Sequence, residues 1–415
     1  MAMNPDVLPR RTAVWVFVAL AAAYFLSTLL RAITATLAPI LTDEFGMQAR
    51  DLGLLAGAYF LGFSITQLPM GHWLDRHGPK RVVLSFLCVA VLGCLAFSWA
   101  NDFTGLLLAR VLIGVGVSAC LMAPLTGYRR WFAMEQQQRA NSWMLMTGAF
   151  GMLASTLPVQ WMLPTVGWRW MFVVLAVLVA LSMVMIVWKV PAWRLDAPTP
   201  SDTPDAGPTL GFMASYKQVW GHPYFRCLAP MGFFNYGGMI AMQTLWAGPW
   251  MVKVAGYTPL EAATGLFWLN VCMLLTFWLW GVVTPSLTLR GYGANKLLTY
   301  GVPISLCVQV AIVLGGAQAG ATHWVLFCMA SSCVSLAQPA VGLAFPSTLA
   351  GRALSAYNLV LFMGVFVVQW GMGLMIDGFL LAGWLQVEAF QLAMSVFGVC
   401  CLASYLHFLK HKPER

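Results

Sequence analysis

Acidic side chains are scarce in this sequence. Only 14 of its 415 residues are Asp or Glu, and 9% of the chain is charged, whereas 60% is hydrophobic. A soluble domain carries about 25% charged residues. So little charge excludes a soluble domain of this length, because its surface would be largely apolar. We therefore expect membrane lipid to solvate most of the folded chain.

The sequence also lacks the patterns of common catalytic and metal sites. It has no HExxH, GxSxG or P-loop motif, its six histidines are dispersed, and its ten cysteines fall in apolar stretches without zinc-type spacing. Its net charge of +9 is not arranged as a basic stripe with interleaved aromatics. We predict no enzyme, no nucleic-acid partner, no cofactor and no metal.

Long apolar runs are present instead. Crossing the hydrocarbon core takes about 20 residues of helix. We predict an all-α polytopic membrane protein with about twelve transmembrane helices, near 13–38, 51–74, 82–100, 103–127, 140–164, 169–190, 224–251, 260–284, 294–316, 322–346, 353–377 and 387–409.

A polar segment divides these runs into two groups of six. Residues 196–211 are rich in Pro, Asp and Thr, which is typical of a linker, and a short interfacial helix is expected over 212–222. We predict two six-helix halves joined by a cytoplasmic linker, with boundaries at 1–190, 191–223 and 224–415. The recurrence of Arg139-Ala140-x-Ser142 as Arg352-Ala353-x-Ser355 supports two related halves, one architecture of alternating-access carriers.

The positions of Lys and Arg predict an orientation. With both termini in the cytoplasm, 18 of these residues fall in cytoplasmic segments, and only Arg50, Arg169 and Lys253 fall on the other side. The positive-inside rule then favours cytoplasmic termini. We expect a monomer that spans the cell (inner) membrane many times.

The most specific motif follows the second predicted span. Its glycine and charged positions are Gly71, Asp75, Arg76, Gly78, Lys80 and Arg81. This segment resembles the loop motif G-x-x-x-D-R-x-G-x-[RK]-[RK] of the major facilitator superfamily. Gly167–Phe172 and Arg110-x-x-x-Gly114-x-Gly116 also resemble motifs of that family. The resemblance implies a secondary transporter.

The loop motif is expected to act as a gate. Asp75 can accept from a helix N-terminus or an arginine in the other half. We expect Gly71 to allow another helix to approach closely, and Gly78-Pro79 to form a tight turn. The alternative is a charged loop that only fixes the topology.

The first predicted span carries a polar stripe. Along one helix face lie Tyr24, Ser27, Thr28, Arg31 and Thr34. A stripe with one arginine is expected to face a wet cavity, where Arg31 would bind a negatively charged substrate. The alternative is that Arg31 extends to the outer surface.

This span resembles the first helix of the organophosphate:phosphate antiporters and their organic-anion relatives. They carry an arginine followed eight residues later by a proline, as Arg31 and Pro39 do here. The resemblance implies that Arg31 holds a phosphate or carboxylate. The seventh span lacks the second arginine of the phosphate carriers, and residue 30 is leucine where acid-coupled relatives have aspartate. These departures favour a monoanion or a mostly apolar carboxylate.

Other polar and aromatic side chains within the spans complete the predicted substrate site: Tyr59, Gln67, Arg110, Asn235, Tyr236, Gln243, Trp246, Asn270, Gln338 and Asn358, with Gln369 as a further amide. Each has a structural alternative. Tyr59 and Trp246 could serve packing alone, and Arg110 and the amides could hydrogen-bond a neighbouring helix.

No acidic residue lies near the centre of a predicted span. Proton coupling would then use a substrate that neutralises Arg31, or one of Asp377, Glu388 and His323 near the outside. We expect a symporter that takes up a small organic anion by alternating access, with protons as a candidate coupling ion. The alternative is efflux of amphipathic or drug-like compounds. The resemblance disfavours it, because Gly148, Gly151 and Pro158 do not have the spacing of the family's glycine-rich antiport motif in the fifth span.

Overall fold

The computed structural model of the protein describes residues 7–193 and 212–413. Within these ranges the chain forms helices and no strand, so the all-α prediction is confirmed. The first seven helices are α1 (Arg10–Phe45), α2 (Ala49–Ile65), α3 (Gln67–Trp99), α4 (Phe103–Val117), α5 (Ala119–Trp131), α6 (Met134–Ala154) and α7 (Leu157–Lys189). The Pro-rich part of the predicted linker, 194–211, lies outside the described residues.

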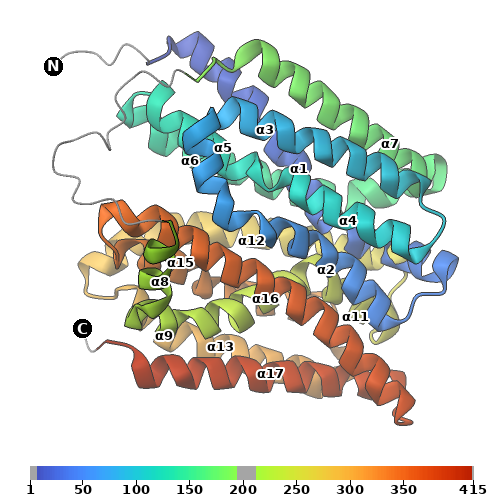
Figure 1. The fold of residues 1–415 in the computed structure, drawn as a ribbon. Helices are drawn as coiled ribbons and strands as arrows, with labels where there is room; N and C mark the ends of the chain where they lie inside the picture. The colour runs from blue at the N-terminus through green and yellow to red at the C-terminus, as the bar shows by residue number, and fades with distance from the viewer. Residues whose placement is uncertain (1–6, 194–211, 414–415) are drawn as a thin grey trace.

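The remaining helices follow in order (Figure 1). They are α8 (Phe212–Gly221), α9 (Pro223–Met231), α10 (Gly237–Ala241), α11 (Ala247–Lys253), α12 (Pro259–Leu289), α13 (Ala294–Gly315), α14 (Ala321–Ser331), α15 (Ala337–Leu343), α16 (Ser347–Leu381) and α17 (Gln386–His411). Two π-helical segments, Gly232–Tyr236 and Met242–Trp246, connect α9, α10 and α11. Two 3-10 turns, Gly316–Gln318 and Ser332–Leu336, lie around α14.

Among the described residues, nine helices are long and apolar enough to cross a membrane. The predicted spans that are not among the nine are those near 51–74, 140–164 and 224–251. Two of the predicted loops are kinks, one within α3 and one within α7. Gly78 has φ 75° and ψ 159° inside α3, and Gly167 has φ 71° and ψ 155° inside α7. Glycine tolerates such backbone angles, which L-residues rarely adopt. The number of crossings stays a prediction.

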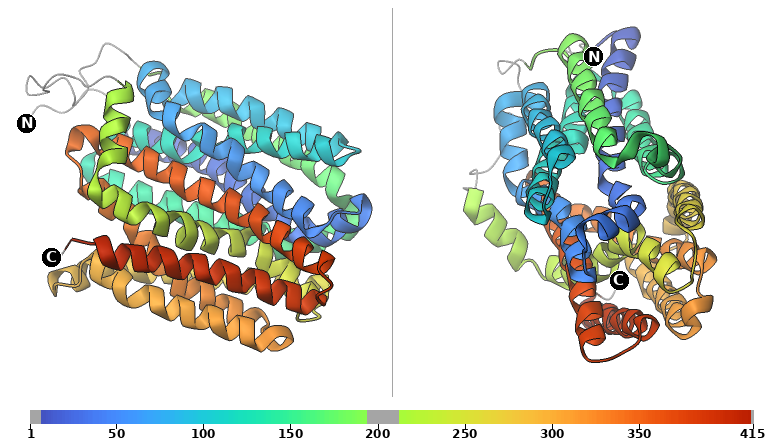
Figure 2. Two further views of the ribbon diagram at one scale, coloured as in Figure 1. Left: turned by 60° about the horizontal axis from the view of Figure 1, so that its bottom comes forward. Right: turned by 90° about the vertical axis from the view of Figure 1, so that its right-hand side faces the viewer.

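The long helices run roughly alongside one another (Figures 1 and 2). The helix α1 begins and α17 ends at the same end of the bundle, which we call the termini end. The connection between α1 and α2 lies at the other end, which we call the opposite end. The helices α2 and α16 lie side by side in both figures.

Glycines allow α2 and α16 to approach closely. A Cβ added at Gly53 would collide with the carbonyl oxygen of Gln369, and one added at Gly373 with that of Ala49. A Cβ at Gly57 would lie 2.9 Å from the ring of Phe366. Gly53, Gly57 and Gly373 therefore serve the packing of these two helices.

Candidate substrate site

Arg31 lies in the interior, where side chains from four segments surround it. It is half-buried on α1, and its guanidinium carbon lies 5.5 Å from the ring centroid of Phe63 on α2 and 5.6 Å from that of Phe362 on α16. Tyr24, Tyr59 and Tyr236 are close enough to interact electrostatically with it. These contacts favour an interior role for Arg31 over extension to the outer surface.

Arg31 has no counter-ion among the described residues. Its Nε is buried without a hydrogen-bond partner. The ion pairs of this part of the chain involve Arg50 and Arg169, with Asp51, Asp377 and Glu44 as the acids. A buried charge without a partner is costly. The site therefore suits a ligand that brings a negative charge.

Arg110 has a different environment. It is 1% exposed, and it donates to the carbonyl oxygen of Leu30 (3.0 Å) and to the hydroxyl of Thr34, both on α1. Its guanidinium carbon lies 5.5 Å from the ring centroid of Tyr59. This geometry matches the alternative in which Arg110 binds a neighbouring helix.

Some residues of the polar stripe of α1 lie at the site, and others form hydrogen bonds with backbone groups. Tyr24 lies near Arg31, and Gly148 on α6 leaves room for its ring. Thr28 donates to the carbonyl oxygen of Phe25 in its own helix (3.0 Å), and the hydroxyl of Ser27 lies 3.5 Å from the carbonyl oxygen of Val117. Only Tyr24 and Arg31 of the stripe therefore share the site.

Four of the predicted amides form two pairs between segments. Gln243 donates to the side-chain oxygen of Asn270 (2.9 Å), which joins the second π-helical segment to α12. Gln338 donates to the side-chain oxygen of Asn358 (2.6 Å), which joins α15 to α16. These side chains are bound to one another.

Three further predicted residues also have protein partners. Asn235 donates to the hydroxyl of Ser404 on α17 (2.7 Å). The amide of Gln67 donates to the carbonyl oxygen of Phe63 (3.2 Å), and the indole of Trp246 donates to that of Gln369 (3.1 Å). Tyr236 is thus the predicted residue of the segment 224–251 that lies near Arg31.

Sequence reasoning missed Phe63 and Phe362, because phenylalanine in an apolar run carries no signal of its own. The sequence spacing between Tyr59 and Phe63 could have indicated that Phe63 lies at the site. It follows Tyr59 by four residues, a spacing that places both rings on one face of α2. Their ring centroids are 6.3 Å apart and the rings are stacked.

The loop motif lies at the termini end. Asp75 is exposed and interacts electrostatically with His72 and with Arg352 at the start of α16. Lys80 donates to the carbonyl oxygens of Val187 (2.8 Å) and Val190 (2.6 Å), so it binds the C-terminal end of α7. Arg76 and Arg81 are exposed.

One expectation for this motif was wrong. Gly71 was expected to allow a close helix approach, yet a Cβ added there would meet no atom within 4 Å. The glycine that needs its missing side chain is Gly78. A Cβ there would collide with Trp193, in addition to the strain of its positive φ. The tight turn predicted at Gly78-Pro79 is a kink within α3.

The three candidate coupling residues differ in their surroundings. Asp377 is 7% exposed and accepts from the backbone N–H groups of Ala49 (3.1 Å) and Arg50 (2.9 Å) at the start of α2. Glu388 accepts from the N–H of Leu385 at the start of its own helix (3.0 Å). His323 is half-buried. Asp377 alone of the three binds a distant helix.

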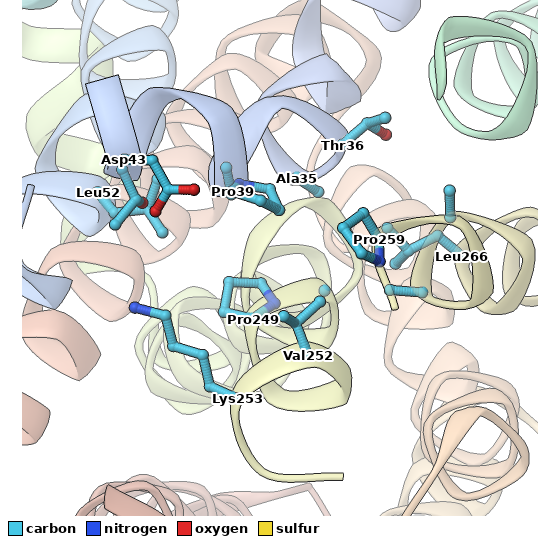
Figure 3. Close-up of a pocket in the computed structure, with 15 residues that line it drawn as sticks. Ala35, Thr36, Pro39, Asp43, Leu52, Pro249, Val252, Lys253, Pro259 and Leu266 are labelled. Atoms are coloured by element: carbon cyan, nitrogen blue, oxygen red, sulfur yellow. The ribbon is translucent and has the colours of Figure 1, made fainter. Parts of the chain in front are cut away.

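A cavity of about 230 Å³ lies between α1, α11 and α12 (Figure 3). Its lining includes Ala35, one turn after Arg31 on α1, and it extends toward the opposite end. Asp43 and Lys253 lie on the same side of it in Figure 3. It does not include Arg31 itself.

Comparison with known proteins identifies the family. The family model "Major Facilitator Superfamily" matches residues 20–369. The "Probable L-galactonate transporter" of Escherichia coli K12 is 27% identical over 33% of this chain, a match that spans 30% of that protein. The "Hexuronate transporter" of the same strain is 22% identical over 68% of this chain and 67% of its own length.

The fold agrees with a solved structure, that of a bacterial homologue of the human lysosomal transporter Spinster in an inward-facing, unoccupied conformation. Its TM-score is 0.80 at 16% identity, and the match covers 97% of this chain and 98% of that one. The expectation of a transporter rather than an enzyme is confirmed by the family match. The chain belongs to the Major Facilitator Superfamily of membrane transporters.

Proposed function

We propose that this protein is a secondary active transporter that moves a small organic anion across the membrane by alternating access, and that Arg31 binds the anion. One observation carries the proposal: a half-buried guanidinium to which the described residues offer no counter-ion, surrounded by side chains from α1, α2, α16 and the segment 232–236. An arginine at the centre of a membrane helix costs about 3 kcal/mol on insertion scales. A bound carboxylate offsets part of that cost through charge-assisted hydrogen bonds.

The similar transporters support the substrate class. The two relatives given above are named as L-galactonate and hexuronate transporters, and both of these compounds are carboxylic acids. A planar guanidinium can bind a carboxylate through two parallel hydrogen bonds. We therefore assign the carboxylate of the substrate to Arg31.

Alternating access requires contacts that open on one side of the site and close on the other. At the termini end, Asp75 on α3 is close enough to Arg352 on α16 to interact electrostatically with it. Asp377 on α16 binds the first turn of α2 at the opposite end. We assign these two contacts to the gates on either side of Arg31. A carboxylate at a helix N-terminus is stabilised there by about 0.3–1 kcal/mol, which is weak enough to be reversible.

The placement in the cell follows from the charge distribution. With 18 basic residues on one side and 3 on the other, the termini end is the cytoplasmic end. We further propose that the chain forms two six-helix halves and is a multi-pass monomer in the inner membrane. The proposed direction of transport is uptake, and the proposed coupling ion is the proton.

The proposal is tested by binding and transport. Purified protein is screened for thermal stabilisation by organic anions, and each hit is followed by counterflow in proteoliposomes. Arg31→Gln should abolish saturable exchange, and Arg31→Lys should weaken it, because lysine keeps the charge without the planar pair of donors. Arg290→Gln is the matched control, since Arg290 is exposed in a loop. Unchanged exchange by Arg31→Gln would refute the assignment.

A further inference from the structure

We infer that the anion held by Arg31 is a monocarboxylate with a flat, apolar body, such as an aryl carboxylate, rather than a polyhydroxylated acid. This inference rests on the proposed function, because it takes Arg31 as the anion-binding residue. It concerns the rest of the substrate, which the other side chains of the same site must accommodate.

The site offers a substrate one positive charge, that of the Arg31 guanidinium. Arg110 is also buried in the described part of the interior, where its two terminal nitrogens donate to Leu30 and Thr34 on α1 and its Nε has no partner. The side chains that interact electrostatically with Arg31 are tyrosines and Cys120 rather than further cations. A second carboxylate would therefore be buried without a partner, which is costly. A singly charged anion fits this site best.

The side chains beside the guanidinium are aromatic and come from the adjacent helices α2 and α16. The ring centroids of Phe63 on α2 and Phe362 on α16 are 4.5 Å apart, and each lies within 5.6 Å of the guanidinium carbon. Phe60 stacks on Phe362 at 6.2 Å. A carboxylate on Arg31 would place the body of the substrate next to these rings. Aromatic pairs contribute about 0.5–1.5 kcal/mol beyond the area that they bury.

Most of the polar side chains predicted for the site are bound to the protein, and the side-chain oxygen of Gln369 is the one predicted amide oxygen that is buried without a partner among the described residues. Gln243 is paired with Asn270, and Gln338 with Asn358. Asn235 donates to Ser404, and the hydroxyl of Tyr59 donates to the carbonyl oxygen of Ser27 (3.2 Å).

Each buried hydroxyl left without a partner costs about 1–3 kcal/mol. A substrate with several hydroxyls would have to break these pairs or lose its hydration uncompensated. The hydroxyls of Tyr24 and Tyr236, which lie near Arg31, have no hydrogen bond to the described part of the chain and could bind a carboxylate oxygen or a single hydroxyl.

An aryl carboxylate differs from the sugar acids after which the similar transporters are named, so the two kinds of substrate can be compared directly. Binding to purified protein is measured by calorimetry, because neutral aryl acids cross lipid unaided. The probes are benzoate, its dianionic analogue phthalate, and galacturonate as the polyhydroxylated acid. The variants are Arg31→Gln and Phe362→Leu. Phe150→Leu is the control, since Phe150 is exposed on α6.

We expect benzoate to bind saturably, phthalate and galacturonate to bind at least 10-fold more weakly, and Arg31→Gln to abolish benzoate binding. Phe362→Leu should weaken benzoate binding about 2- to 10-fold, and Phe150→Leu should leave it unchanged. Unchanged melting temperatures will show that each variant is folded.

Three results would overturn the inference. Arg31-dependent binding of galacturonate in preference to benzoate contradicts the apolar substrate and leaves the proposed function in place. Equal binding of phthalate and benzoate contradicts the single charge. If Arg31→Gln changes the binding of none of the three probes, the inference and the proposed function both fail.

Discussion

Arg110 on α4 donates a hydrogen bond to the backbone carbonyl oxygen of Leu30, the residue that precedes Arg31 on α1. It also donates to Thr34, one turn further along. The two intramembrane arginines thus have different surroundings although they are neighbours. The Nε of both side chains is buried without a hydrogen-bond partner among the described residues, but the two terminal nitrogens of Arg110 are bound to α1.

The first prediction follows from this bond. Arg110→Lys retains the charge but cannot donate to both α1 partners with one planar group. Hydrogen bonds from a charged donor contribute about 1.5–3 kcal/mol. We expect a lower melting temperature and weaker anion binding, measured by thermal shift and calorimetry, with Arg290→Lys as the unaffected control. If stability and affinity both remain at wild-type values, Arg110 does not hold α1 in position.

The second prediction compares two glycines. Gly53→Ala would force a Cβ against the carbonyl oxygen of Gln369, whereas Gly71→Ala meets no atom within 4 Å. Overpacking costs about 1–3 kcal/mol. We expect Gly53→Ala to lower the melting temperature and Gly71→Ala to have little effect on it. Equal melting temperatures for the two variants would contradict the packing described for α2 and α16.

The third prediction distinguishes the effect of backbone strain from that of a steric collision, by comparing Gly78 of the loop motif with Gly167. Gly78 and Gly167 have nearly the same φ, 75° and 71°, yet only a Cβ at Gly78 collides, with Trp193. Their ψ values, 159° and 155°, place both in a positive-φ region that is essentially restricted to glycine and that costs an L-residue about 1–3 kcal/mol. Gly78→Ala should therefore be clearly more destabilising than Gly167→Ala in thermal unfolding. A second variant, Gly78→Ala with Trp193→Ala, should recover the difference, and failure to do so would argue against the collision.

The helices could be predicted from sequence because a backbone in lipid must satisfy its own hydrogen bonds, and apolar runs of sufficient length do so as helices. Continuity through Gly78 was not predictable in the same way. The pair Gly78-Pro79 indicates a break, whereas the chain kinks there and α3 continues.

The site was predictable only in part. Arg31, Tyr24, Tyr59 and Tyr236 could be selected because each is polar within an apolar span, and the structure places them together. The amides met the same criterion, but their partners come from other helices. A pair such as Gln243 and Asn270 is 27 residues apart in sequence, and no local pattern connects its members.

The last prediction concerns the contact between α16 and α2. The carboxylate of Asp377 accepts from the N–H groups of Ala49 and Arg50, so it satisfies two donors of the first turn of α2 and lies at the positive end of that helix. Arg50 Nε lies 4.0 Å from the same carboxylate. Asp377→Asn removes the negative charge and one acceptor while keeping the size of the side chain. Because a helix cap contributes about 1 kcal/mol, the contact should open roughly five times more often.

Hydrogen–deuterium exchange can measure that opening. We expect the amides at the start of α2 and at the end of α16 to exchange faster in Asp377→Asn. Glu388→Gln is the matched control, since Glu388 lies near the same end but caps its own helix through Leu385. It should speed exchange at the start of α17 and leave α2 unchanged. If Asp377→Asn alters exchange only within α16, the carboxylate does not hold α2, and its assignment to the gate at this end is wrong.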